Sequence, residues 1–162
     1  MFETHLDGTY AWLGLAVVSV VTVGVAATLP ASPPPDASGV AQTIDSVADS
    51  SYPATAEHGI AADELRVTPR SVELDDGNGI AWAALHGPKI TPVTDKMADA
   101  GQSGPLAQVL GGVPPQLVFD DPAALAAAAA DARSGDHHWS VSSGTVTVRH
   151  VQYEEVHVTL VG

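Results

Sequence analysis

One uncharged run near the N-terminus limits what this chain can fold into more than any other feature. Residues Ala11–Leu29 contain no charged side chain, and Pro30 follows directly. A helix of that length spans about 28 Å, close to the hydrocarbon thickness of a bilayer. Tyr10 and Trp12 lie at its start, where aromatic rings favour the membrane interface. The run therefore predicts a single transmembrane helix over residues 11–29.

Two other interpretations of the run stay open. A cleaved secretory signal usually has a basic segment before a shorter apolar core, whereas Met1–Tyr10 contains Glu3 and Asp7 but no Lys or Arg. Small residues around Ala27 still permit cleavage, and a buried helix of a soluble protein is the third alternative. We expect a retained anchor, with the N-terminus inside the cell and the rest of the chain outside.

The charge of the chain excludes one class of partner. Asp and Glu number 19 against six Lys and Arg, which gives a formal net charge of -13. Nucleic-acid binding depends on cationic side chains that neutralise phosphates, so a nucleic-acid partner is not expected. The carboxylates are scattered through segments that can fold, which suggests a protein adapted to high salt. There is no cysteine, so disulfide bonds and thiolate chemistry are excluded.

Proline marks the start of the folded domain. Residues 30–36 have the sequence PASPPPD, which is typical of an extended, semi-rigid linker. Residues 37–162 then form one acidic domain, because a segment of this size is long enough for one hydrophobic core but not for two. The predicted organisation is an N-terminal segment and helix over residues 1–29, the linker, and this domain.

Three stretches of the domain are predicted to be helical. Residues 37–50 follow a cap at Asp36 or Ser38, residues 106–110 form a helical turn, and residues 122–133 are mostly alanine. Alanine side chains are small and permit close approach, so we expect the alanine-rich helix to lie flat against a sheet. The apolar residues that share one face of the first helix are Val40, Ile44 and Val47.

Alternating apolar residues predict strands between and after these helices. The sequence DDGNG at residues 75–79 is a turn signal, and residues 70–86 around it are predicted to form a β-hairpin. Residues 89–93 are predicted as a short edge strand, because Pro92 cannot donate a backbone hydrogen bond. The predicted C-terminal meander consists of residues 139–142, 145–153 and 156–161, and the predicted loops are residues 50–59 and 94–105. The order of elements indicates an α+β fold with antiparallel strands and two or three helices, placed after the transmembrane helix.

The acidic turn resembles a calcium-binding loop only in part. Counted from Asp75, an EF-hand loop requires glycine at the sixth position and glutamate at the twelfth, where this chain has Ile80 and His86. A hairpin turn through Asn78 and Gly79 is therefore the preferred interpretation.

Histidines near the C-terminus raise the question of a metal site. His137, His138, His150 and His157 lie on or beside predicted strands, and imidazole is a common ligand of zinc and copper. However, adjacent histidines point apart in an extended chain, and His150 and His157 can face opposite sides of their strands. We therefore predict no metal ligand and no cofactor.

Catalytic motifs are also missing from the sequence. Asp136, His138 and Ser140 are neighbours, but nearness in sequence does not create the geometry of a catalytic triad. Neither a phosphate-binding glycine loop nor a nucleophile motif is present. We predict that the protein is not an enzyme, and we interpret Trp82 and Trp139 as core or rim residues.

Several segments together resemble an uncharacterised haloarchaeal family of short membrane-anchored proteins. They are MFETHLDGTYAW, ATLPASPPPDASGVAQTIDSVA, LGGVPPQLVFDDPAAL and RHVQYEEVHVTLVG. The resemblance implies a role in the cell envelope beside type IV pilus or secretion machinery, with a pilin-like layout. The chain departs from archaeal prepilins because Asp7-Gly8, without Lys or Arg, precede the apolar run. An accessory subunit therefore fits the resemblance as well as a pilin does.

These observations predict a membrane-anchored envelope protein that acts as a structural or interaction subunit. Its expected partners are the lipid bilayer, through residues 11–29, and other proteins of a membrane assembly. Small residues in the run, such as Gly14, Ser19 and Gly24, would permit close helix packing. The alternative is a membrane-tethered module that binds a small ligand or a metal outside the cell.

Overall fold

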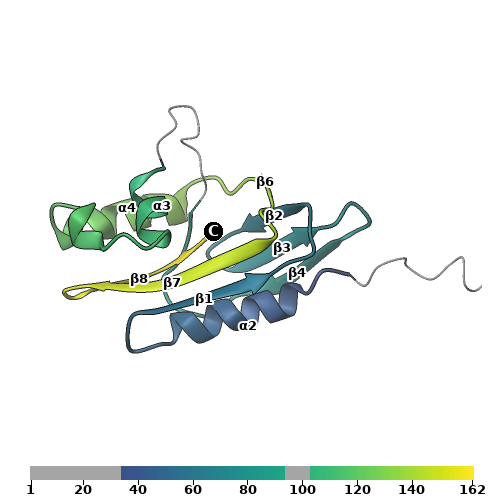
Figure 1. Cartoon of the computed structure of the whole chain (residues 1–162), viewed down its shortest axis with the longest axis horizontal. Coiled ribbons are helices and arrows are strands. Elements are labelled where there is room, and N and C mark those ends of the chain that lie inside the picture. Colours follow the sequence, from purple (N-terminus) through teal and green to yellow (C-terminus); the bar gives the residue numbers. More distant parts are fainter. Residues whose placement is uncertain (1–33, 94–102) are drawn as a thin grey trace, which may run out of the picture. The chain divides into compact units, whose positions relative to one another are not determined.

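The computed structural model describes residues 34–93 and 103–162, which belong to one compact unit, Pro34–Gly162. Helices and strands alternate irregularly along this unit (Figure 1). The helices are α2 (Ala37–Ala48), α3 (Pro105–Leu110), the 3-10 helix η2 (Pro115–Leu117) and α4 (Pro122–Ser134). The strands are β1 (Ala54–Gly59), β2 (Glu64–Val67), β3 (Ser71–Asp75), β4 (Ile80–Ala84), β5 (Ile90–Pro92), β6 (Ser140–Val141), β7 (Thr145–Tyr153) and β8 (Val156–Val161).

The strands form two separate four-stranded sheets. The first sheet has the order β1-β7-β8-β5, in which β5 runs parallel to β8 and the other pairs are antiparallel. The second sheet has the order β4-β3-β2-β6 and is antiparallel throughout. Consecutive strands β2, β3 and β4 are neighbours, whereas β5 follows β4 closely in the chain but pairs with the last strand, β8, in the other sheet.

Helix α2 packs against both sheets. Its N-terminus is capped by Asp36, whose carboxylate accepts a hydrogen bond from the Gly39 N–H at 2.8 Å. One face of α2 is buried, including Val40 and Ile44, which are fully inaccessible to solvent. These side chains join inward residues of both sheets in one hydrophobic cluster. Burial of this apolar stripe, rather than helix propensity alone, therefore stabilises α2.

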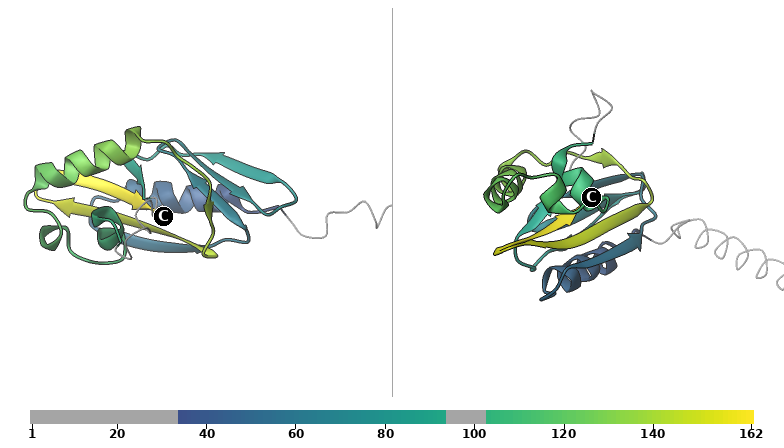
Figure 2. Two further views of the ribbon diagram at one scale, coloured as in Figure 1. Left: turned by 90° about the horizontal axis from the view of Figure 1, so that it is seen from above. Right: turned by 60° about the vertical axis from the view of Figure 1, so that its left-hand side comes forward.

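Helices α3 and α4 cover the opposite face of the first sheet (Figure 2). Asp121 caps α4 by accepting a hydrogen bond from the Ala124 N–H at 2.7 Å, and Pro122 occupies the first turn. Leu125 and Ala129 are fully buried in a second hydrophobic cluster with residues of β7 and β8. Near its C-terminus, Arg133 donates a hydrogen bond to the hydroxyl of Thr91 on β5 at 2.8 Å. The expectation that α4 lies against a sheet is confirmed.

The predicted fold class is corrected in its membrane-spanning part. The described residues form an α+β domain, but none of their helices is long and apolar enough to cross a bilayer. The longest of them, α4, has 13 residues. The predicted span over residues 11–29 lies outside the described residues, as does most of the predicted loop over residues 94–105.

Three local predictions were wrong, and all concern strand pairing. The strands were expected to be antiparallel, but β5 runs parallel to β8. Residues 54–59 were expected in a loop but form β1, because they pair with β7 along its whole N-terminal half. The predicted meander is right for β7 and β8, which pair with each other. However, β6 pairs with β2 in the second sheet and is not part of that meander. The helices over residues 37–50 and 122–133, the hairpin over residues 70–86 and the short edge strand at Pro92 are confirmed.

Candidate interaction surface

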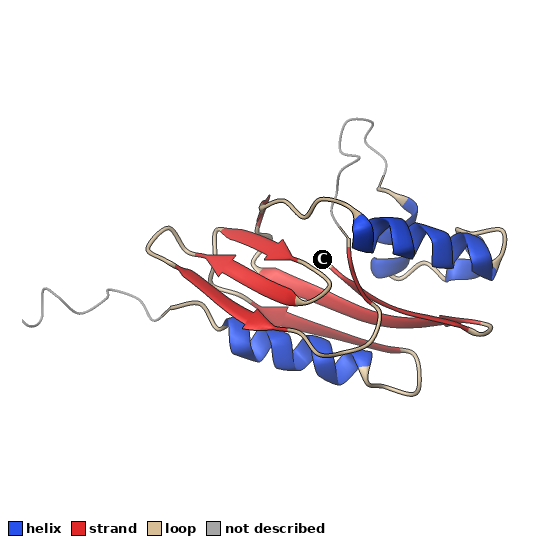
Figure 3. Ribbon diagram, turned by 180° about the vertical axis from the view of Figure 1, so that it is seen from behind, coloured by secondary structure: helices blue, strands red, loops and turns tan. Residues whose placement is uncertain are grey.

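The second sheet has one face in the core and one face toward solvent. Inward residues of β2 and β3, such as Leu65 and Leu74, are buried beside α2, while alternate residues point outward. Figure 3 shows β2, β3 and β4 from behind, with no helix of the described chain across their outer face. We call this outer face of β4, β3, β2 and β6 the open face. It is the candidate functional site, because large apolar side chains gather along its edges.

The first row of the open face crosses the sheet as aromatic, acidic, basic and aromatic residues. The strand register places Trp82 beside Glu73 and Glu73 beside Arg66. Arg66 forms an ion pair with Glu73, in which its Nε donates to Oε2 at 3.0 Å. The guanidinium carbon of Arg66 also lies 4.8 Å from the ring centroid of Trp139, a cation–π distance. The charges in the middle of the row therefore satisfy one another, and Trp82 at the end remains 67% exposed.

A second row repeats this layout without a cation. Ile80 of β4 faces Asp75, Asp75 faces Glu64, and Glu64 faces Val141 of β6. Ile80 and Val141 are 60% and 85% exposed. Isolated apolar residues on a surface are ordinary, but here exposed apolar side chains from two rows lie next to each other on β4. The open face thus combines an acidic centre with apolar edges.

The acidic turn is a hairpin turn, as expected, but the residue with left-handed backbone angles is not one of the two that were predicted. The Asp76 carboxylate accepts hydrogen bonds from the N–H groups of Asn78 and Gly79, at 2.9 and 3.0 Å. The hydrogen bond of the Asn78 N–H is the main cause that lowers the pKa of Asp76. Gly77 has a φ of 77°, so the left-handed position of the turn lies there and not at Asn78-Gly79. The carboxylates are thus engaged with the turn backbone.

Two of the candidate histidines do lie together. His150 and His157 share a face of the first sheet because His150 pairs with Thr159, two residues from His157, and their ring centroids are 5.8 Å apart. His150 Nδ1 is 3.1 Å from the Thr159 hydroxyl, and its Nε2 is buried without a partner. Burial, and then the nearby His157, lower the pKa of His150. Among residues 34–93 and 103–162, however, no three His, Asp or Glu side chains are grouped so that they could hold a metal ion.

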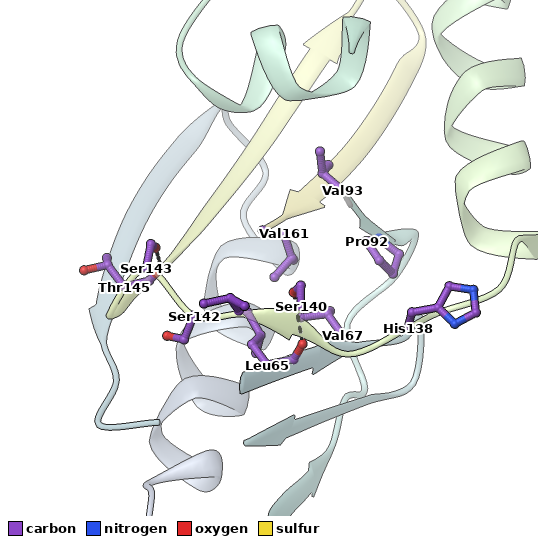
Figure 4. A pocket seen from close by; sticks show the side chains of 12 residues that line it. Leu65, Val67, Pro92, Val93, His138, Ser140, Ser142, Ser143, Thr145 and Val161 are labelled. Carbon is purple, nitrogen blue, oxygen red and sulfur yellow. Dashed lines mark hydrogen bonds between the residues drawn. The ribbon is translucent and has the colours of Figure 1, made fainter. Parts of the chain in front are cut away.

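Ser140 and His138 line a cavity of about 310 Å³ beside the ends of β2, β5 and β8. Figure 4 shows His138 at one end of this cavity, away from Ser140. The Ser140 hydroxyl donates to the Leu65 carbonyl at 3.1 Å, so it helps to hold β6 against β2. That contact, rather than a pairing with His138, accounts for Ser140 in the described structure. The neighbouring residues in the sequence therefore do not assemble into a nucleophile and its base.

Sequence reasoning named Trp82 and Trp139 as core or rim residues but missed the open face that they share. The available signal was the segment Ile80–Ala84, IAWAA, in which the larger side chains alternate with alanines. Alternation alone does not say which side is buried. Ala81 and Ala83 face the core, where they pack against the hydrophobic cluster that includes α2, whereas Ala84 points outward.

Comparison with known proteins gives a family but no function. A family model described as a family of unknown function, DUF7283, matches residues 3–151 of the 162-residue chain. Neither a curated protein nor a solved structure matches the chain. The resemblance to an uncharacterised family is thus confirmed at that level, and the chain belongs to the DUF7283 family of unknown function.

Proposed function

We propose that this domain is a non-catalytic structural or interaction subunit of a larger assembly and that it binds through its open face. The observation that carries this proposal is the exposure of Trp82 and Ile80 side by side on a sheet face that no helix of the described residues covers. Tryptophan contributes strongly to protein interfaces, because a large rigid ring can be desolvated at a small cost in conformational entropy.

The acidic middle of the open face supports a protein partner over an apolar ligand. Glu64 and Asp75 face each other across β2 and β3 and lie between the apolar edges. A partner surface with apolar contacts at its periphery and a hydrogen-bond donor between them would complement this arrangement. A lipid or another wholly apolar molecule would leave these carboxylates desolvated and without partners.

The wider role belongs to the same proposal. We infer a position in the cell envelope, outside the cell, as an accessory component of a haloarchaeal pilus or secretion system. This part rests on the sequence resemblance and the acidic composition. Protease added to intact cells tests the location, because an exposed domain is digested before lysis and an internal one is not.

A second candidate function is the binding of a small ligand in the cavity beside Ser140. The cavity combines apolar side chains, such as Leu65 and Val161, with the hydroxyls of Ser142 and Ser143 (Figure 4). A compound that binds there should raise the melting temperature of the protein. A Ser142→Trp variant, which puts a large side chain at a residue that lines the cavity, should lose that shift.

Site-specific photocrosslinking in cells tests the main proposal. A photoreactive phenylalanine analogue replaces Trp82 in the full chain, and the same analogue at Tyr52 serves as the control. Tyr52 is 78% exposed but lies outside the open face, so it matches Trp82 in size and accessibility. We expect a discrete adduct from position 82 only. No adduct at position 82, or the same adducts at both positions, would contradict the proposal.

A further inference from the structure

We propose that β4 pairs with β4 of a second copy of this chain, so that the two second sheets join into one continuous sheet. This inference rests on the proposed function, because it names a partner for the β4 edge of the open face, where Ile80 and Trp82 lie. The two strands would run antiparallel about a two-fold axis at Trp82.

The free edge of β4 presents a regular set of backbone groups. The Leu85 N–H donates a hydrogen bond to the Arg70 carbonyl at 2.8 Å. This hydrogen bond identifies the residues of β4 whose backbone groups point toward β3. Hydrogen-bonded and non-hydrogen-bonded residues alternate along an antiparallel pair. The N–H and C=O groups of Ala81 and Ala83 therefore point toward β3. The corresponding groups of Ile80, Trp82 and Ala84 therefore point away from β3, toward the open edge.

The other sheet edges of the described residues carry features that hinder strand addition. Strand β1 includes the charged Glu57, β5 has three residues and contains Pro92, and β6 has only two residues. Charge, proline and shortness are the usual means by which proteins protect sheet edges. Strand β4 has five residues without a charge or a proline. Within residues 34–93 and 103–162, β4 is thus the least protected edge.

Within the described residues, a groove of about 460 Å³ lies between β4 and α2. Small side chains line most of it, namely Ala83 and Ala84 on β4 and Ala41 and Ser46 on α2, whereas Gln42, Asp45 and His86 are the larger lining residues. The inward side chains of an added β4 would be the alanines Ala81 and Ala83, which are small enough for this groove.

Strand β4 is complementary to itself in an antiparallel arrangement. With the axis at Trp82, Ile80 faces Ala84 of the second copy and the two Trp82 residues face each other, all on the open face. Aromatic and aliphatic side chains that meet across strands stabilise a sheet. Each of the outward backbone groups of β4 also finds a partner.

The antiparallel orientation limits the repulsion between two chains that each have a net charge of -13. No charged residue lies on β4 itself, so like charges do not face each other between the paired strands, and Asp45 of α2 is the acidic residue that lines the groove beside them. An antiparallel pair puts the acidic turn at Asp75 and Asp76 of one copy beside the end of the strand near His86 of the other. It also keeps the two acidic turns at opposite ends. The remaining repulsion between two acidic chains should decrease in molar salt.

Disulfide trapping in the full chain tests this pairing. The chain contains no cysteine, so Trp82→Cys introduces a single thiol. Residues that face each other in a hydrogen-bonded antiparallel pair have Cα atoms about 5.5 Å apart, within the range of a disulfide. The control Ser71→Cys lies on β3, next to Ala84. Three strand spacings would separate the two copies of β3 by about 14 Å, too far for a disulfide.

We expect Trp82→Cys to form a covalent dimer under mild oxidation in molar KCl and Ser71→Cys to stay monomeric. Light scattering of the wild-type chain, with and without a mild detergent, should give twice the mass of one chain. A monomeric wild type without trapping at position 82 would overturn the inference. Equal trapping in both variants would also overturn it, because it would indicate random collisions.

A backbone substitution provides a second test that leaves the tryptophan in place. Ala84→Pro removes one outward N–H of β4 without removing a hydrogen bond to β3, and Ala84→Val retains that N–H. We expect at least a tenfold weaker dimer for the proline variant, and little change for the valine variant. Circular dichroism confirms that both are folded. Equal dimerisation of the two folded variants would contradict pairing through β4.

The crosslinking result separates this inference from the proposed function. An adduct at position 82 with the mass of two chains supports both. An adduct of another mass, with a monomeric wild type, retains the interaction subunit but overturns the self-pairing. No adduct at position 82 overturns the proposed function itself.

Discussion

The two sheets of this domain have the same number of strands but differ in what covers them. The first sheet lies between α2 on one face and α3 and α4 on the other, and four successive residues of β8, from Val158 to Val161, are buried. The second sheet is covered on its inner face, so β3 and β4 alternate between inward and outward residues. Burial on both faces thus marks the structural centre of the domain, whereas the open face is the one to which we assign the proposed binding role.

The largest expected effect comes from truncating matched large side chains in the two sheets. Leu160→Ala, in the first sheet, removes a fully buried side chain and should destabilise the domain by about 2–5 kcal/mol. Trp82→Ala, on the open face, should change the stability of the monomer by only about 0.5 kcal/mol. Urea unfolding at low protein concentration measures both. A Trp82→Ala loss as large as that of Leu160→Ala would refute the contrast.

A smaller effect is expected where α2 holds the end of the second sheet. The carboxylate of Asp45 accepts hydrogen bonds from the N–H groups of His86 and Gly87, both at 2.9 Å. Asp45→Ala leaves these donors without that acceptor and should cost about 1–3 kcal/mol. Asp45→Asn keeps a side-chain oxygen at this position and should lose less. Unfolding midpoints of the two variants, measured together, test whether the acceptor matters; equal losses would argue against it.

The first sheet should also respond to pH through His150. Burial lowers the pKa of His150 in the folded state, so below about pH 6.5 the unfolded chain binds more protons. Stability should therefore decrease as the pH falls through about 6.5. In His150→Leu this contribution should disappear, whereas the exposed control His138→Leu should keep it. Melting temperatures at about pH 7.5 and about pH 5.5 provide the comparison. An unchanged pH dependence in His150→Leu would rule out His150 as its source.

The smallest effect is expected for the ion pair of the open face. Arg66 and Glu73 are partly exposed, with side-chain accessibilities of 34% and 19%. Such a pair typically contributes about 0.2–1 kcal/mol, and salt screens it. A double-mutant cycle with Arg66→Met and Glu73→Gln should give a coupling energy in that range, decreasing in molar KCl. A larger coupling energy that does not depend on salt would contradict this expectation, because it would indicate that the ion pair is shielded from solvent.

Part of the open face was predictable from the sequence. The hairpin was evident from DDGNG and from alternation, so Glu73 and Trp82 could be expected on neighbouring strands. The cation–π contact between Arg66 and Trp139 could not be predicted, because β6 has two residues and lies far from β2 in the sequence. Such a short strand has no pattern of its own, and its position is decided by its partner.

Local physics determined the helices of this protein from its sequence. Asp36 and Asp121 cap α2 and α4, and apolar spacing or alanine content defines their packed faces, because helix signals depend on residues close in the chain. The tertiary structure alone decided that ATAEHG at residues 54–59 becomes β1 and that Trp82 points outward. Both outcomes depend on distant segments. Strand β7 supplies hydrogen bonds that β1 cannot make alone, and the inner side of β4 packs through Ala81 and Ala83 against the cluster that includes α2.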